Sequence, residues 1–110
     1  KLYNDLTLKG AEVLTAPAAF TKQTGEAHWH ILQRARAIEN GSYMISAAQG
    51  GHHEDGRETF GHSLIIDPWG KVIVEIDHDK PDVAIAEIDL NLVVEARQKI
   101  PNLKNMRKYQ

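Results

Sequence analysis

Residues Thr24 to Asn40 have the sequence TGEAHWHILQRARAIEN, and this stretch decides how the rest of the chain is interpreted. Its apolar residues recur at the spacing of an α-helix. Thr24 can cap the start by accepting a hydrogen bond from a first-turn N–H, and Gly41 follows where a left-handed residue ends many helices. The stretch therefore predicts one helix that ends at Gly41.

One side of this predicted helix carries both apolar and ionisable residues. At about 100° per residue, the apolar residues on that side are Ala27, Ile31, Leu32, Ala35 and Ile38. His28 and Glu39 fall within the same arc. Ionisable groups on a buried face need hydrogen-bond partners. We therefore expect His28 and Glu39 to give structural support by bonding to neighbouring structure.

The composition is that of one ordinary globular domain, with 110 residues, 42% hydrophobic and 25% charged. A net charge of −2 gives no basic footprint, so we expect neither nucleic acid nor an anionic membrane as a partner. The sequence shows no membrane-spanning run and no signal peptide, which predicts a cytoplasmic protein. Because cysteine is absent, the chain can form no disulfide, no thiolate metal site and no cysteine nucleophile.

The segments around the central helix predict a mixed α/β fold. The expected strands are residues 12–16, 42–49, 63–66, 72–76 and 83–88. The expected flanking helices are residues 1–9 and a helix from Asp89 or Asn91 to Lys99. The first helix should turn Leu2, Tyr3 and Leu6 inward. Beyond the last helix, three apolar side chains could anchor a polar tail: Leu103, Met106 and Tyr109.

Two connections have informative sequences. In Asp67-Pro68-Trp69-Gly70 the aspartate, proline and glycine occupy the positions that a type I turn favours, which predicts a β-hairpin. Residues 50–58 are rich in glycine, histidine and charge, and predict a mobile loop.

The predicted strands are almost continuously apolar, which decides the architecture. A strand with one face in water would alternate apolar and polar residues. These strands need cover on both faces, yet the chain supplies only about three helices. We therefore expect the chain to be half of a larger sandwich.

Six histidines raise the question of a metal site. His28 and His30 are two residues apart on a helix and point to different sides. His52 and His53 are adjacent, with carboxylates close by, but no spaced partner completes a recognisable ligand set. We predict no metal and no cofactor, and a zinc site at His52 and His53 is kept as an alternative.

No catalytic constellation is complete in the sequence. Ser63 begins a strand, so pairing it with the adjacent His62 would place the two side chains on opposite faces. We expect Ser63 to form a hydrogen bond at the strand edge, and His62 and Asp67 to order the loop 50–58 as structural support. Three arginines are candidates for ion pairs with Glu39, Asp67 or Asp89: Arg34, Arg36 and Arg97.

Two segments together resemble a known family: GAEVLTAPAAFTKQTGEAHWHILQRARAIENGSYMISAAQGG at residues 10–51 and GHSLIIDPWGKVI at residues 61–73. Residues 2–101 resemble the C-terminal half of the nitrilase, or carbon–nitrogen hydrolase, superfamily, and most of all its Nit-type amidases, the ω-amidase and deaminated-glutathione amidase branch. The resemblance implies a four-layer α-β-β-α sandwich, which would cover the second face of the strands. His30 stands where family members often have a glutamate.

The resemblance also implies a mechanism. Members use a Glu–Lys–Cys triad in which the carboxylate is the general base, the thiolate attacks the substrate carbon and the lysine stabilises the oxyanion. All three belong to the N-terminal half, so we expect no catalytic residue here, a triad upstream of Lys1, and no activity of the 110 residues alone. The substrate would be a small carboxylate-bearing amide, or else a nitrile or carbamoyl compound.

The resemblance implies positions for the substrate pocket and for a partner chain. The residues expected to line the pocket are Pro17, Ala18, Phe20 and Thr21. Residues 49–60 would border the entrance. Helices 1–9 and 27–40 would form a homodimer surface. The alternative to an enzyme is a non-enzymatic dimerisation or binding module on the same scaffold.

Overall fold

The computed structural model describes residues 1–107, and Tyr109, one predicted tail anchor, lies outside them. The main sheet has four strands in the order β1 (Val13–Thr15), β2 (Tyr43–Ser46), β5 (Ser63–Ile66) and β6 (Val72–Ile76). β1 runs parallel to β2, and the other two neighbouring pairs are antiparallel. The predicted mixed α/β class is confirmed.

The helical run that follows β1 begins earlier than predicted. It consists of α2 (Lys22–Thr24), a π-helical turn (Gly25–Trp29) and α3 (His30–Asn40). Thr24 is therefore not the cap, as predicted, and lies inside the run. Thr21 precedes the run with an extended backbone, and its hydroxyl lies 2.7 Å from that of Thr24. Gly41 ends the helix with a φ of 56°, as predicted.

The predicted inner face of this helix is wrong. The buried residues facing the sheet are Trp29, Gln33, Ala37 and Asn40. Ile31 is 68% exposed, and His28 and Glu39 also lie on the exposed side. The reason is a tertiary contact: the buried Ser46 hydroxyl of β2 donates to Gln33 Oε1 at 2.5 Å, so a polar residue occupies the inner face without an unpaired group.

The first helix also differs in the face that it buries. In α1 (Leu2–Leu8), Thr7 is buried and Tyr3 packs against the core, as predicted for Tyr3. Leu2 and Leu6 are 65% and 41% exposed, so their predicted inward orientation is wrong. The Thr7 hydroxyl donates to Tyr3 O at 2.9 Å, and this bond allows a threonine to occupy the inner position.

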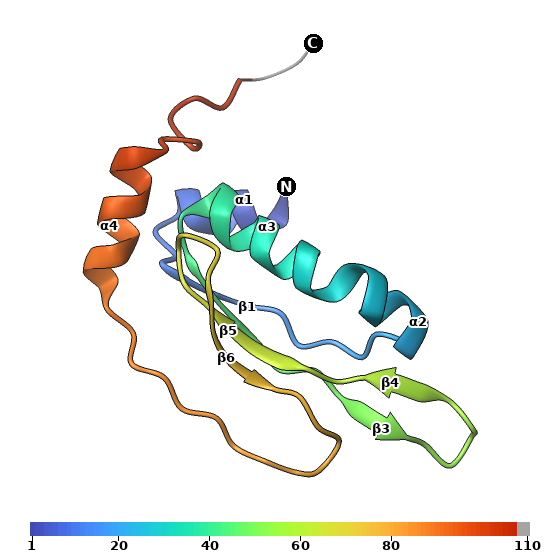
Figure 1. Cartoon of the computed structure of the whole chain (residues 1–110). Helices are drawn as coiled ribbons and strands as arrows, with labels where there is room; N and C mark the ends of the chain where they lie inside the picture. The colour runs from blue at the N-terminus through green and yellow to red at the C-terminus, as the bar shows by residue number, and fades with distance from the viewer. Residues whose placement is uncertain (108–110) are drawn as a thin grey trace.

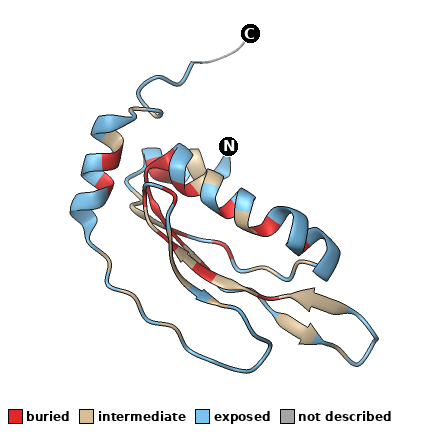
Figure 2. Ribbon diagram, viewed as in Figure 1, coloured by how far each residue is buried: buried red, intermediate tan, exposed pale blue. Residues whose placement is uncertain are grey.

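The two faces of the main sheet have different cover. Figure 1 shows α1 and α3 on the same side of the sheet, and Figure 2 shows that burial concentrates between them and the strands. The core cluster there consists of Leu14, Ala16, Trp29, Ala37, Met44, Leu64 and Ile66. On the opposite face, Ile45 pairs with Ile65 and Ile65 with Val74, and all three are only half-buried. The core thus lies on one face of the sheet, as expected for half of a larger sandwich.

The predicted last strand, residues 83–88, is absent as a strand. This segment crosses from β6 to α4 without pairing to any described strand, and Val83 and Ile85 are 80% and 87% exposed. The β-forming sequence is present, but within residues 1–107 it forms no ladder with another strand. The helix that follows, α4 (Leu90–Lys99), starts as predicted, because Asp89 Oδ1 accepts from Asn91 N–H at 2.9 Å.

The two connections behave differently from each other. Gly70 has a φ of 91° and its N–H donates to Asp67 O at 2.9 Å, which confirms the predicted hairpin turn between β5 and β6. Residues 50–58 form most of a second hairpin, where a loop was predicted. Its strands are β3 (Gly50–His52) and β4 (Glu58–Phe60), paired antiparallel.

Candidate functional site

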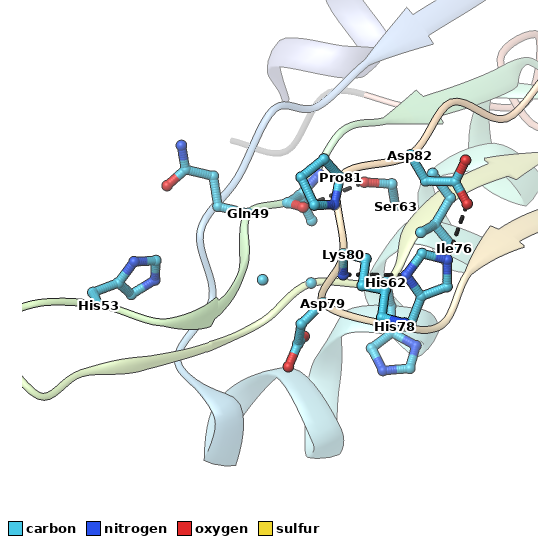
Figure 3. Close-up of a pocket in the computed structure, with 13 residues that line it drawn as sticks. Gln49, His53, His62, Ser63, Ile76, His78, Asp79, Lys80, Pro81 and Asp82 are labelled. Carbon is cyan, nitrogen blue, oxygen red and sulfur yellow. Dashed lines mark hydrogen bonds and ion pairs between the residues drawn. The ribbon is translucent and has the colours of Figure 1, made fainter.

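A hollow of about 550 Å³ lies where the β3–β4 hairpin meets the segment after β6 (Figure 3). Its walls come from the segment that follows β2, from the hairpin, from the start of β5, and from Ile76 and residues 78–82. Figure 3 shows Gln49 and His53 on the hairpin side and Lys80, Pro81 and Asp82 on the other. Imidazole, ammonium and carboxylate groups therefore surround one cavity, which suits a small polar ligand.

The segment after β6 is held in place by its own side chains. His78 Nε2 lies 3.0 Å from Asp82 Oδ2, and Lys80 N–H donates to His78 Nδ1 at 3.2 Å. Val83 N–H donates to Asp82 Oδ1 at 2.7 Å. The hydrogen bond from Val83, followed by the one from His78, lowers the pKa of the Asp82 carboxyl below its ordinary value. Asp82 is thus held in its charged form beside the hollow.

Ser63, at the base of the hollow, is bonded to the backbone. Its Oγ accepts from Ala48 N–H at 3.0 Å, and its hydroxyl donates to Ala48 O at 3.3 Å. The predicted hydrogen bond at the strand edge is confirmed. The chain contains no cysteine. The hollow therefore offers groups that can bind a ligand, but the hydroxyl of Ser63 is engaged in hydrogen bonds with the backbone of Ala48.

The four residues expected to line a substrate pocket lie beside this hollow and not in its wall. Ala18 pairs in parallel with Ala48, which is a wall residue. Phe20 is half-buried, with its ring edge-on to Trp29 at a centroid distance of 5.1 Å. Pro17 is exposed, and Thr21 pairs with Thr59 of β4. The role of these residues toward a substrate remains a prediction.

One cluster of titratable groups, His30, His62 and Glu75, was not predicted from the sequence. Glu75 Oε2 lies 2.9 Å from His30 Nε2 and 2.6 Å from His62 Nδ1. Partial burial acts to raise the pKa of the Glu75 carboxyl, but the hydrogen bonds from His62 and His30 outweigh it and lower the pKa. The three residues are far apart in the sequence. The one available signal is a charged Glu75 inside the apolar strand VIVEI.

The remaining support residues occupy separate places. Glu39 is exposed and pairs with Arg36 at 2.9 Å, which is the one predicted arginine pair that forms. His28 is exposed on the outer side of the helical run. Asp67 lies at the far end of β5, where its Oδ1 accepts from Trp69 N–H and Lys71 N–H at 2.8 and 3.0 Å. It closes its own turn, so the expectation that it orders residues 50–58 is wrong.

The other two arginines bind backbone carbonyl groups rather than carboxylates. Arg34 Nε donates to Gly70 O at 2.7 Å. Arg97 donates to the carbonyl oxygens of Ala11 and Asn40 and to Ser42 Oγ. Both arginines therefore connect helices to the ends of strands and turns.

The histidines of the hairpin have one partner each. His52 Nδ1 lies 3.0 Å from Glu58 Oε1, and His53 Nε2 lies 2.8 Å from Thr59 Oγ1. Among residues 1–107, the group of three potential metal ligands is His30, His62 and Glu75. The alternative zinc site at His52 and His53 thus has no third ligand in the described part of the chain.

None of the helices within residues 1–107 has the length and apolar content that crossing a membrane requires.

Comparisons with known proteins agree with the fold. The family model described as carbon-nitrogen hydrolase matches residues 1–98. The deaminated glutathione amidase of Dictyostelium discoideum is 47% identical over 111 aligned residues, which cover 99% of this chain and 38% of that protein. The chain therefore spans less than half the length of this relative.

Solved structures show the same similarity. The NitFhit protein of C. elegans superposes with a TM-score of 0.90 at 43% identity, covering 96% of this chain and 26% of that one. Nit3 of Saccharomyces cerevisiae, a member of branch 10 of the nitrilase superfamily, has a TM-score of 0.84 at 32% identity, over 91% of this chain and 36% of that one. The chain has half of the nitrilase fold, and it belongs to the carbon–nitrogen hydrolase family.

Proposed function

We propose that this chain is the C-terminal part of an amidase that hydrolyses the amide bond of a small carboxylate-bearing substrate. The observation that carries the proposal is the 47% identity to a deaminated glutathione amidase over 99% of the chain. Similarity that extends over both sheet and helices supports a shared enzyme class. No relative named here supports the alternative of a non-enzymatic binding module.

The open face of the main sheet supports the view that the chain is one part of a larger domain. Ile45, Ile65 and Val74 lie side by side on this face and are only half-buried. Pairs of apolar residues on a sheet face are stabilised when a second layer covers them. In the proposed enzyme, a second sheet from the remaining part of the protein packs here.

The chemistry is proposed to come from a Glu–Lys–Cys triad upstream of Lys1. The glutamate takes the proton of the thiol, the thiolate attacks the amide carbon, and the lysine stabilises the oxyanion. The amine leaves with a proton and a thioester forms. Water then cleaves the thioester, which releases the carboxylic acid and restores the thiol. The 110 residues alone have no cysteine and are proposed to be inactive.

This chain would contribute the wall of the substrate pocket. We assign that role to the segment after β1, namely Pro17, Ala18, Phe20 and Thr21. Backbone hydrogen bonds connect this segment to the residues that follow β2: Ala18 N–H donates to Ala47 O at 2.9 Å, and Gln49 N–H donates to Ala18 O at 3.0 Å. The β3–β4 hairpin would border the entrance, since Phe60 N–H donates to Phe20 O at 2.9 Å.

Homodimer formation through α1 and α3 is part of the same proposal. Both helices expose large apolar side chains: Leu2, Leu6, Leu8, Ile31, Leu32 and Ile38. Exposed apolar patches of this kind are typical of protein–protein interfaces. Ile31→Asp should convert the dimer into a monomer in sedimentation experiments, whereas Ile85→Asp, at a side chain outside α1 and α3 that is 87% exposed, should not.

The experiment that tests the enzyme class uses the complete open reading frame that encodes this chain. Deaminated glutathione, simple amides and nitriles are supplied in parallel, and release of amine or ammonia is measured. We expect hydrolysis of the amides, with preference for those that carry a carboxylate. Hydrolysis of none of these substrates by the folded protein would contradict the proposal, and hydrolysis of nitriles alone would replace amidase by nitrilase.

A further inference from the structure

Three side chains from separate elements meet at one point: His30 in α3, His62 just before β5, and Glu75 in β6. Their ligand atoms, His30 Nε2, His62 Nδ1 and a Glu75 carboxylate oxygen, all lie within 4.8 Å of one another. We propose that this His30–His62–Glu75 cluster is a binding site for a zinc-class transition-metal ion.

The donor set selects the class of ion. Two imidazole nitrogens and one carboxylate oxygen suit Zn²⁺ and its neighbours, while Mg²⁺ and Ca²⁺ require oxygen ligands. Ligand atoms about 2.0–2.2 Å from a tetrahedral ion stand roughly 3.3 Å apart. The two contacts to Glu75 now measure 2.6 and 2.9 Å, so a small widening of the cluster admits the ion. Water would occupy the fourth position.

The backbone and the neighbouring rings hold His62 in place. Its φ of 59° is in the left-handed region, which a residue other than glycine seldom occupies. The indole N–H of Trp29 donates to His62 O at 2.7 Å, and the imidazole stacks on Phe60 with ring centres 4.0 Å apart. Rotation of this ring is therefore restricted before any ion arrives, which lowers the cost of ordering the ligands.

His30 and Glu75 are carried by elements other than the segment that holds His62. His30 is the first residue of α3 and meets Phe60 edge-on, with ring centres 5.9 Å apart. Glu75 is paired with Leu64 across β5 and β6, so its side chain is on the sheet face that α3 covers. Each ligand is thus carried by a different element, and closing the site requires only side-chain adjustment.

An adjacent hollow gives an ion access to the cluster. This hollow has a volume of about 390 Å³ and includes His62 in its wall. Its charged lining consists of Lys22 against Glu26, Glu58, Asp77 and Asp79. The excess of carboxylates attracts cations. The three ligand side chains are 25–35% exposed, so the ion reaches them without opening the core.

Metal binding leaves each neutral imidazole with its one proton. Without metal, Glu75 accepts N–H hydrogen bonds from both imidazoles. A neutral imidazole carries one proton and can hold it on either nitrogen. When the ion takes His30 Nε2 and His62 Nδ1, each remaining proton is on the opposite ring nitrogen, and the carboxylate binds the ion directly. Acid protonates the imidazoles and therefore weakens binding.

The test titrates the chelator-treated protein with Zn²⁺ by calorimetry and with Co²⁺ by visible absorption, which reports tetrahedral coordination. The variants His30→Ala, His62→Asn and Glu75→Gln each remove one ligand. Asparagine is used at position 62 because it tolerates positive φ. His52→Ala is the matched control, since His52 has a comparable contact of 3.0 Å with a glutamate but belongs to no group of three potential ligands within residues 1–107.

We expect one Zn²⁺ per chain, a Co²⁺ spectrum of tetrahedral type, and at least about a tenfold loss of affinity in each ligand variant. The His52→Ala protein should bind as the parent does, and Mg²⁺ should not compete. Circular dichroism without metal confirms that each variant is folded. The inference would be overturned if the parent protein did not bind Zn²⁺, or if the three ligand variants bound Zn²⁺ as tightly as the parent. A loss of Zn²⁺ affinity in His52→Ala alone would also overturn it.

Discussion

Arg97 of α4 makes three hydrogen bonds to the end of α3 and the start of the sheet. Its Nη2 donates to Ala11 O at 2.9 Å and to Ser42 Oγ at 3.0 Å, and its Nε donates to Asn40 O at 3.3 Å. We predict that Arg97→Ala lowers the free energy of unfolding by about 2–3 kcal/mol.

The size of this loss in unfolding free energy follows from the acceptors that Arg97→Ala would leave without a donor. Ser42 and Asn40 are 0% and 1% exposed, so water cannot easily replace the lost donor. The two bonds near 3 Å contribute about 1 kcal/mol each, and the bond to Asn40 contributes less because it is longer. Arg97 is only part-buried, so the larger values measured for fully buried charged groups do not apply.

Urea unfolding followed by circular dichroism measures the loss, and Arg36→Ala is the matched control. Arg36 is also a helical arginine, but its partner Glu39 is 52% exposed, so its removal should cost no more than about 0.5 kcal/mol. Lysine at position 97 should restore only part of the stability, because an ammonium cannot form the fork of hydrogen bonds. The reasoning is refuted if Arg97→Ala and Arg36→Ala have equal effects.

Three further predictions concern local structure. Gly25→Ala should destabilise the fold, because the added alanine Cβ would stand 2.2 Å from Phe60 Cβ. The overpacking cost of about 1–3 kcal/mol exceeds the helix-propensity gain of about 1 kcal/mol. A higher thermal midpoint of the variant would contradict this prediction. Asp89→Ala removes the α4 cap and should cost about 1 kcal/mol in urea unfolding, so an unchanged midpoint would refute the capping role. The pKa of the Asp82 carboxyl, followed by ¹³C NMR, should lie below its ordinary value of 3.8. The contribution of this carboxylate to stability should be lost as the pH falls through the lowered pKa. A titration midpoint above 3.8 would show that the hydrogen bond from Val83 does not persist.

Features with local causes were predictable from the sequence. The β5–β6 turn needs only the aspartate, proline and glycine of residues 67–70, and the start of α4 needs only Asp89. The end of α3 at Gly41 is equally local. Each of these depends on residues at most three positions apart, so no knowledge of the fold was required.

Features that depend on distant partners were not predictable in the same way. Gln33 faces inward because Ser46, on a strand, donates to it, and periodicity alone places a glutamine outside. Residues 83–88 have the composition of a strand, but pairing needs a partner strand in register beside them, and within residues 1–107 they pair with none. Strand propensity reports that a segment suits a sheet, and not that a sheet is available.

The candidate site divides in the same manner. A hydrogen bond of Ser63 at the strand edge was predictable, because alternation along a strand turns Ser63 away from His62, but its partner Ala48 was not. The cluster of His30, His62 and Glu75 was not predictable, because its members are 13 to 45 residues apart and come together only when α3 packs on the sheet. A ligand set on three elements has no fixed spacing that a sequence motif could capture.

The proposal that this chain is the non-catalytic part of an amidase is tested most directly by comparing amide hydrolysis in two proteins. One is the product of the complete open reading frame, and the other is the folded 110-residue chain. With deaminated glutathione as substrate, we predict amine release by the complete protein and none by the chain alone. Hydrolysis by the chain alone at the rate of the complete protein, or no hydrolysis by the folded complete protein, would contradict the proposal.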